Sequence, residues 1–240
     1  MILAVDAGNS RVKWGIFDGD WVAQGAVPNS DIVRLGEAWK HYGRPSQIVV
    51  SNVAGEKVRS LLSVLFIRWR LAPLWVRAKK TQCGVTNRYR EPNELGCDRW
   101  AALIAAWHSN PKRSLVVSLG TAMTVDALNE AGEFVGGIIV PGITVMQECL
   151  ARKTATLEVL PGQFKLLPEN TADAIFTGAI LALAGAVDRM AKGFMAGPDC
   201  IIVTGGGAPV LLPHLPAGAQ HQENLVLQGL IHIAQEKVAA

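Results

Sequence analysis

The strongest constraint on the fold is a glycine-turn hairpin that occurs twice, about half a chain apart. The first copy, residues 2–19, reads ILAVDAGNSRVKWGIFDG, and the second, residues 115–137, reads LVVSLGTAMTVDALNEAGEFVGG. In each copy an apolar, strand-like run leads through a small-residue turn into a second β-rich run. Glycine lets the backbone approach a ligand closely, and successive N–H groups in such turns form concave anion sites. The duplication therefore predicts a nucleotide held between two lobes, and with it phosphoryl transfer.

Composition narrows the class of protein. The chain has 240 residues, of which 50% are hydrophobic and 18% charged, so it can bury a substantial core. Together with the repeat, this length favours two lobes over one large domain. The formal net charge of +3 is too small to indicate nucleic-acid binding, and the densest basic cluster, residues 77–80, is typical of a solvated loop. We therefore expect no nucleic-acid partner.

Cysteine usage and apolar runs predict the compartment. The four cysteines, Cys83, Cys97, Cys149 and Cys200, lack the short spacing of a zinc or redox motif, and reduced cytosolic thiols are the simplest interpretation. The N-terminus has no basic region before an apolar core, so no secretory signal is expected. The longest apolar run, residues 174–187, is shorter than the ~20 residues that a membrane span needs. We expect a cytoplasmic protein without a membrane partner.

A β-meander followed by interleaved strands and helices predicts an α/β protein with two ribonuclease-H-like lobes. A polar, proline-bearing break at residues 109–114 separates the lobes, which we place at residues 1–113 and 114–240. In the first lobe the apolar patterns predict strands over 2–5, 12–17, 21–27, 47–53 and 74–76, and helices over 31–42 and 55–65. In the second they predict a repeated meander, helices near 145–151 and over 171–192, a strand over 201–203 and a closing helix over 224–239.

The first hairpin carries two candidate phosphate-binding groups. Asp6 ends the first strand just before Gly8, where a carboxylate could hold a Mg²⁺ bound to ATP phosphates. The alternative is a turn-forming Asp that bonds its own backbone. Lys13 could lie on the exposed face of an alternating strand, but the hairpin brings it back beside Asn9 and Ser10. There an ammonium group could neutralise a transferred phosphoryl group, and the cluster favours this interpretation.

Asp98 and Arg99 lie at the start of an amphipathic helix, and this pair of charged residues predicts a second reactive site. The alternative role of Asp98 is that of a helix N-cap. A cation such as Arg99 in the first turn opposes the helix dipole, so it is unfavourable there unless it serves a ligand. The pair could accept a hydroxyl proton and bind an anionic substrate group. Asp126, in the second hairpin, is interpreted as a strand or turn residue without a catalytic role.

Two further segments of the second lobe suggest binding roles. The run 204–207, Thr-Gly-Gly-Gly, follows a buried strand, where glycines would let an adenine or ribose approach the backbone. A tight strand-to-loop turn is the alternative. Thr171 heads a helix rich in small residues, and capping is its default role. The small face would allow close helix contact, either within the lobe or across a dimer.

The ordered motifs resemble those of the type III pantothenate kinases over nearly the whole chain. They are Asp6-Ala7-Gly8-Asn9-Ser10 with Lys13; Leu95-Gly96-Cys97-Asp98-Arg99; Gly120-Thr121-Ala122-Met123-Thr124-Val125-Asp126 with Gly136-Gly137 and Pro141-Gly142; Asn170-Thr171; and Thr204-Gly205-Gly206. The resemblance implies the actin-like ATPase fold that acetate and sugar kinases, Hsp70 and actin share. It also implies phosphorylation of pantothenate by ATP, the first step toward coenzyme A.

The resemblance implies a role for each matching position. The ATP phosphates would be bound by Asp6, Ala7, Gly8, Asn9, Ser10, Arg11, Val12 and Lys13, with Asp6 near Mg²⁺ and Thr121 touching ATP. Asp98 would be the general base that takes the proton from the pantothenate hydroxyl. The pantothenate pocket would be lined by Tyr89, Gly96, Cys97, Asp98 and Arg99. Thr171 would reach pantothenate from the neighbouring subunit of a homodimer.

Two positions depart from the family pattern. Ser118 stands where many members carry an Asp associated with a monovalent cation, NH₄⁺ or K⁺, so other acceptors would have to support activation by such a cation. Cys97 stands where a smaller residue is usual, and Cys behaves as a small hydrophobe.

Two other functions stay open. One is a kinase of the same fold for another small hydroxyl substrate. The other is a non-catalytic regulator linked to transcription, as Bvg accessory factors of this family were named. No helix-turn-helix or concentrated basic face in the sequence supports DNA contact.

Overall fold

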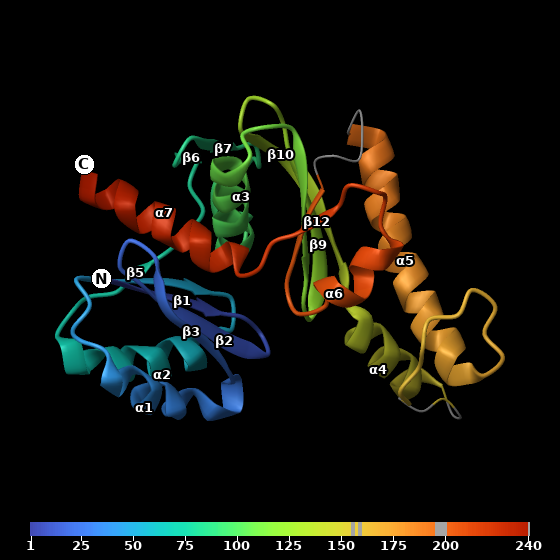
Figure 1. Ribbon diagram of the computed structural model, residues 1–240, viewed down its shortest axis with the longest axis horizontal. Coiled ribbons are helices and arrows are strands. Elements are labelled where there is room, and N and C mark those ends of the chain that lie inside the picture. The colour runs from blue at the N-terminus through green and yellow to red at the C-terminus, as the bar shows by residue number, and fades with distance from the viewer. Residues whose placement is uncertain (155–156, 158–159, 195–200, 240) are drawn as a thin grey trace. The chain divides into compact units, whose positions relative to one another are not determined.

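The computed structural model describes residues 1–154, 157, 160–194 and 201–239 (Figure 1). The chain forms two compact units. Unit 1 contains Met1–Pro111, Gly132–Phe134 and Asn224–Ala240, and unit 2 contains Lys112–Ala131 and Val135–Glu223. The sequence pattern predicts a second lobe that runs over residues 114–240 as one block. The structure instead places residues 132–134 and the C-terminal helix in unit 1.

Unit 1 is built on a five-stranded sheet with the order β3-β2-β1-β4-β5. Its strands are β1 (Ile2–Ala7), β2 (Arg11–Phe17), β3 (Trp21–Pro28), β4 (Gln47–Asn52) and β5 (Leu74–Trp75). The first three form an antiparallel meander, and β4 and β5 continue parallel to β1. These strands confirm the predicted meander, because alternating apolar side chains on β2 bury one face of the hairpin.

Helices cover both faces of this sheet (Figure 1). On one face lie α1 (Leu35–Ala38) and α2 (Glu56–Phe66), where Trp39 stacks on Phe66 with ring centroids 5.9 Å apart. The predicted continuous helix over 31–42 is wrong: 3₁₀ turns at Asn29–Arg34 and Trp39–His41 flank the single turn of α1. Asp31 has non-helical dihedral angles, and apolar spacing alone does not distinguish 3₁₀ turns from an α-helix.

The C-terminal helix α7 (Leu225–Ala239) covers the other face and packs against α3 (Cys97–Ser109). At their crossing, a Cβ on Gly229 would lie 1.8 Å from the carbonyl oxygen of Ala101, so only glycine permits this approach. Leu225 and Leu230 of α7 are fully buried. The closing helix was therefore predicted correctly, but its return to unit 1 depends on a long-range contact that local patterns do not reveal.

Two short strands, β6 (Thr81–Gln82) and β7 (Val85–Asn87), precede α3 and pair with each other. The strand β10 (Glu133–Pro141) begins beside β7, where Phe134 pairs with Asn87. This pairing is the reason that residues 132–134 belong to unit 1. Cys83, Cys97 and Cys149 are free thiols, and Cys200 lies outside the described residues.

Unit 2 repeats the meander with β8 (Ser114–Leu119), β9 (Ala122–Leu128) and β10, and adds β11 (Ile201–Thr204) and β12 (Gln220–His221). The order is β12-β11-β8-β9-β10. Its helices are α4 (Ile143–Lys153), α5 (Thr171–Phe194) and α6 (Ala208–Leu211). The predicted strand over 201–203 and the helices near 145–151 and over 171–192 are thereby confirmed. Asp126 lies buried in β9, as a strand residue.

The helix α5 has 24 residues, so it is longer than the apolar run 174–187, which by itself is too short for a membrane span. By length and composition it is the one helix of the described chain that could cross a membrane. Ile180, Leu183 and Val187 are nevertheless fully buried within unit 2. The core helix of a soluble domain passes the same test of length and composition, so the helix is weak evidence for a membrane span.

Candidate active site

Asp6, near the end of β1, has two polar neighbours in the sheet. In the antiparallel register it pairs with Lys13 of β2, and in the parallel register with Ser51 of β4. The prediction that the hairpin brings Lys13 back toward the first strand is correct, but its partner in the register is neither Asn9 nor Ser10. The direct partner of Lys13 in the sheet is instead Asp6, which bears the carboxyl group.

The Asp6 carboxyl group is electrostatically unusual. Its Oδ1 atom is buried and has no hydrogen-bond partner among the described residues. Burial, followed by the nearby charge of Asp98, raises the pKa of Asp6 to about 7, although Lys13 and a hydrogen bond from Ser51 act to lower this pKa. A buried carboxylate with an unpaired oxygen is costly unless a cation joins it. One carboxylate beside phosphate oxygens is the kind of site Mg²⁺ uses, so this donor fits the metal.

The turn between β1 and β2 is held by Asn29, which the sequence analysis missed. Its Nδ2 donates to the carbonyl oxygens of Gly8 at 2.9 Å and Asn9 at 2.8 Å, and its backbone N–H donates to that of Ser10 at 3.1 Å. The N–H of Gly8 also donates to the Arg11 carbonyl at 3.0 Å. Asn29 follows β3, about 20 residues along the chain, so no local motif marks it.

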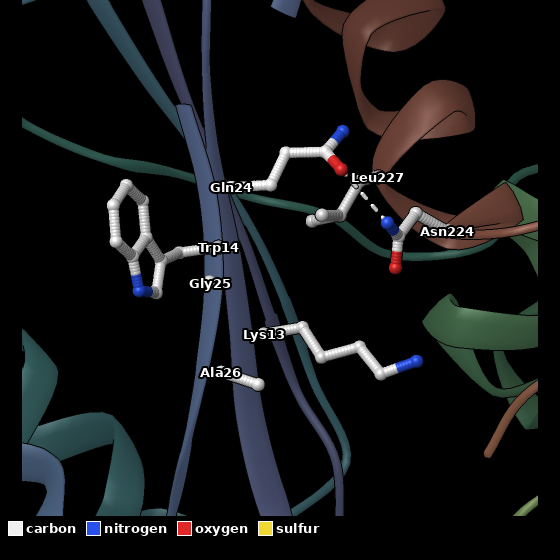
Figure 2. A pocket seen from close by; sticks show the side chains of 7 residues that line it. All are labelled: Lys13, Trp14, Gln24, Gly25, Ala26, Asn224 and Leu227. Carbon is white, nitrogen blue, oxygen red and sulfur yellow. Dashed lines mark hydrogen bonds between the residues drawn. The ribbon is translucent and has the colours of Figure 1, made fainter. Parts of the chain in front are cut away.

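Lys13 borders a pocket of about 250 Å³ within unit 1. Figure 2 shows its side chain extending away from Trp14, on the side of Gln24 and Asn224, whose side chains are hydrogen-bonded at 2.9 Å. The lining residues are Lys13, Trp14, Gln24, Gly25, Ala26, Asn224 and Leu227. Within the described part of the chain, no side chain forms a salt bridge with the Lys13 ammonium group.

Asp98 is the second residue of α3, and the N-cap is Gly96, so the N-cap alternative for Asp98 is wrong. The backbone N–H of Arg99 donates to Asp98 Oδ1 at 2.8 Å. A Cβ on Gly96 would lie 2.6 Å from the same oxygen. Glycine at position 96 thus leaves the space in which the Asp98 carboxylate lies.

The structure brings Arg99 and Tyr89 together. The Arg99 side chain is buried, and its guanidinium group lies over the rings of Tyr89 and Phe134, 6.0 Å and 5.8 Å from their centroids. One guanidinium nitrogen is 3.5 Å from the Tyr89 hydroxyl. The ring contacts give this cation a structural partner besides any ligand. Cys97, the first residue of α3, is buried with its sulfur 3.4 Å from the Ser51 hydroxyl oxygen.

Unit 2 gathers its glycine-bearing turns at the ends of β8 and β11. A Cβ on Gly205 would lie 2.4 Å from the Leu119 carbonyl oxygen, and Gly205 has a φ of +96°. The N–H of Gly142 donates to the Thr121 carbonyl at 2.9 Å. The turn that carries Thr121 and the run 204–207 therefore adjoin within this unit.

Ser118 has hydroxyl-bearing neighbours on both sides. In register it pairs with Thr204 of β11 and Thr124 of β9. The Thr124 Oγ1 atom is buried and has no hydrogen-bond partner among the described residues. Ser118 and its two neighbours in the sheet thus offer neutral hydroxyl oxygens rather than a carboxylate.

Thr171 is the first residue of α5 and is exposed. Capping is done by Asn170 instead, whose Oδ1 accepts a hydrogen bond from the Asp173 N–H at 2.9 Å. The default capping role expected for Thr171 is therefore wrong. Asp173 accepts hydrogen bonds from the Gln163 N–H at 2.8 Å and the Asn170 amide at 2.9 Å, and forms an ion pair with Lys165 at 2.9 Å. These contacts anchor the preceding loop to α5.

Solved structures match this architecture over nearly the whole chain. A Campylobacter jejuni structure named for Baf family transcriptional activators matches with a TM-score of 0.65 and 20% identity, covering 99% of this chain and 100% of that one. The activator of 2-hydroxyisocaproyl-CoA dehydratase from Clostridium difficile, with bound ADPNP, matches with a TM-score of 0.57 and 10% identity, covering 99% and 96%. The two-lobed fold is that of actin-like ATPases and sugar kinases, as expected.

Sequence relatives narrow this class to one family. The family model described as type III pantothenate kinase matches residues 2–193. A type III pantothenate kinase from Nitrosospira multiformis is 48% identical over 242 residues, covering 98% of this chain and 92% of that protein. The chain belongs to the type III pantothenate kinase family.

Proposed function

We propose that this protein transfers the γ-phosphoryl group of ATP to the hydroxyl group of pantothenate. The product is 4'-phosphopantothenate, and the reaction is the first step of coenzyme A biosynthesis. The observation that carries the proposal is the juxtaposition of Asp6 with Lys13 on the first hairpin, in electrostatic contact with Asp98, in a chain of this family. Carboxylates and a cation of this kind are what phosphoryl transfer requires.

The ATP phosphates are assigned to the segment Asp6–Lys13. The hydrogen bonds of Asn29 hold the turn in one conformation, and the Lys13 ammonium group offsets charge on the transferred group. The Asp6 carboxyl group, with its unpaired buried oxygen, would hold Mg²⁺. When bound, Mg²⁺ supplies positive charge to the phosphate oxygens.

Asp98 is the proposed general base. The pantothenate hydroxyl oxygen attacks the γ-phosphorus, its proton passes to the Asp98 carboxylate, and ADP leaves. The Arg99 N–H fixes one oxygen of this carboxylate, and Gly96 leaves it room. Gly96, Cys97, Arg99 and Tyr89 are assigned to the pantothenate pocket, where the guanidinium group would meet the substrate carboxylate.

Unit 2 contributes the remaining assignments. Thr121 is proposed to touch ATP, and the adjoining glycine run 204–207 to approach the adenosine. Thr171 is proposed to reach pantothenate across a homodimer. The exposed face of α5, which carries Ala174, Gly178 and Ala182, supports close helix contact in such a dimer. For NH₄⁺ or K⁺, the hydroxyl groups beside Ser118 are the available acceptors. The proposed setting is cytoplasmic, without nucleic-acid or membrane partners.

The primary test is ATP-dependent phosphorylation of pantothenate by the purified protein with Mg²⁺ and K⁺ or NH₄⁺. Product detection by mass spectrometry supports the proposal. An acceptor panel under the same conditions identifies a kinase for another hydroxyl substrate if pantothenate fails. Salt-dependent DNA binding without any turnover would support the regulator instead.

A further inference from the structure

A fully buried serine lies between the two elements that carry the proposed metal ligand and the proposed base. Ser51 of β4 is 0% exposed and pairs with Asp6 in the parallel register of the sheet. Its Oγ atom is 3.4 Å from the Sγ atom of Cys97, the residue immediately before Asp98. Ser51 therefore touches both the strand of Asp6 and the first residue of α3.

The hydrogen bonds around Ser51 run in one direction. The Ser51 hydroxyl donates to the Asp6 carboxyl group, which lowers the pKa of that carboxyl. Because a hydroxyl has a single proton, the proton between Ser51 and Cys97 must then come from the thiol. Burial raises the pKa of the Cys97 thiol, so it stays protonated and able to donate. The N–H of Asn52 in turn donates to the Cys97 sulfur at 3.2 Å.

These contacts form a chain from the Asn52 N–H through the buried side chains of Cys97 and Ser51 to Asp6. Hydrogen bonds linked in this way polarise one another and weaken together when one member is lost. Cys97 therefore does more than fill space as a small hydrophobe. An alanine at position 97 could neither accept from Asn52 nor donate to Ser51, whereas a serine could do both.

We propose that Ser51 and Cys97 are positioning residues, which set the start of α3, and with it Asp98, against the Asp6 carboxyl group. The inference rests on the phosphotransfer function proposed above. A misplacement of about 1 Å between reacting groups can cost about 10²-fold in rate. The expected signature is a loss of kcat rather than of ATP binding.

The first experiment compares Ser51→Ala with Ser114→Ala in the purified protein. Ser114 is also a strand residue that is 0% exposed, but its hydroxyl group has no hydrogen-bond partner among the described residues. We expect Ser51→Ala to lower kcat for pantothenate by about tenfold or more, with KM for ATP within roughly threefold of the original. Ser114→Ala should leave both values within roughly twofold. Equal kcat values for the two variants would overturn the proposal.

A second series addresses Cys97 and covers the case in which Ser51→Ala does not fold. Cys97→Ala should lower kcat about as much as Ser51→Ala, and Cys97→Ser should recover most of that loss. The double variant Ser51→Ala/Cys97→Ala should lose less than the product of the single losses, since both changes break the same chain. Additive losses, or no difference between the two Cys97 variants, would contradict the inference.

Amide hydrogen exchange supplies a readout that needs no turnover. The Asn52 amide should exchange faster in Cys97→Ala than in the unchanged protein and should be protected again in Cys97→Ser. Unchanged Asn52 exchange in Cys97→Ala would remove the basis of the inference. The unchanged protein could fail to phosphorylate pantothenate while the Asn52 amide still exchanges as expected in the Cys97 variants. In that case the proposed function is wrong, but the hydrogen-bonded link between Asn52, Cys97 and Ser51 is supported.

Discussion

Asp6 and Lys13 face each other across the first hairpin as a register pair of β1 and β2. The pair places a carboxyl group and an ammonium group at the same end of the sheet, close to the turn that Asn29 holds. Opposite charges at this position suit a ligand that combines a divalent cation with phosphate oxygens.

Replacement of Lys13 by alanine should lower kcat/KM for ATP by about 10²–10³-fold, because the cation stabilises charge on the transferred phosphoryl group. Folding should be retained, since Lys13 forms no salt bridge within the described residues. Steady-state kinetics and thermal unfolding check both statements. Lys40→Ala is the matched control, because Lys40 lies on the surface in an exposed ion pair with Glu37. Similar kinetics for both variants would show that Lys13 does not contribute to phosphoryl transfer.

Asp98→Asn should lower kcat by at least ~10²-fold if Asp98 is the base. Because Asp98 is not the N-cap, its replacement should cost about 0.3–1 kcal/mol of stability through the helix dipole, less than the loss of a cap. Asp188→Asn, at an exposed ion pair with Lys192, serves as control. Near-normal turnover of Asp98→Asn would assign the base elsewhere.

Gly96→Ala tests the placement of the Asp98 carboxylate. The new methyl group would lie 2.6 Å from Asp98 Oδ1, so the side chain must move. We expect kcat to fall by about tenfold or more, with a small change in the unfolding midpoint, because a side chain yields more easily than backbone. Gly193→Ala, where a Cβ meets nothing within 4 Å, should have no such effect on kcat. A fully active Gly96→Ala would show that this carboxylate position is not needed.

The pH dependence of the free energy of unfolding should show the contribution of Asp173, whose contacts anchor the loop before α5. The Gln163 N–H, the Lys165 ion pair and the Asn170 amide lower the pKa of Asp173 from 3.8 to about 2. A carboxyl group whose folded pKa is depressed stabilises the fold above its unfolded pKa, and this contribution is lost as the pH falls. The stability difference between the unchanged protein and Asp173→Asn should therefore be constant above about pH 5 and shrink between pH 4 and pH 2. Thermal unfolding across this range measures it, and a difference independent of pH would contradict the assignment.

Ser118→Asp should strengthen the activation of turnover by K⁺ or NH₄⁺, because a carboxylate attracts a monovalent cation more strongly than neutral hydroxyl oxygens do. Initial rates against KCl at constant ionic strength, with choline chloride as the balancing salt, give the activation constant. An identical K⁺ dependence in both proteins would show that the cation, if required, binds away from Ser118.

The two hairpins were predictable because their patterns are local. Alternating burial along β2, with Val12, Trp14 and Ile16 inward, leaves Lys13 on the opposite face, where the register pairs it with Asp6. The type of helix over residues 31–42 was not predictable, since apolar spacing fits both 3₁₀ turns and an α-helix. Asn29 was missed because its partners lie in the turn between β1 and β2, about 20 residues earlier in the chain, and no motif links them.

The sequence by itself determined the duplicated sheet, the family motifs and the residue types that can carry phosphoryl transfer, because each depends on neighbours within a short stretch of chain. Only the tertiary structure decided that α7 completes unit 1 and that Ser51 joins Asp6 to Cys97. The last contact spans 46 residues. Such contacts depend on strand register and helix packing, which are set by the burial of the whole core rather than by any single segment.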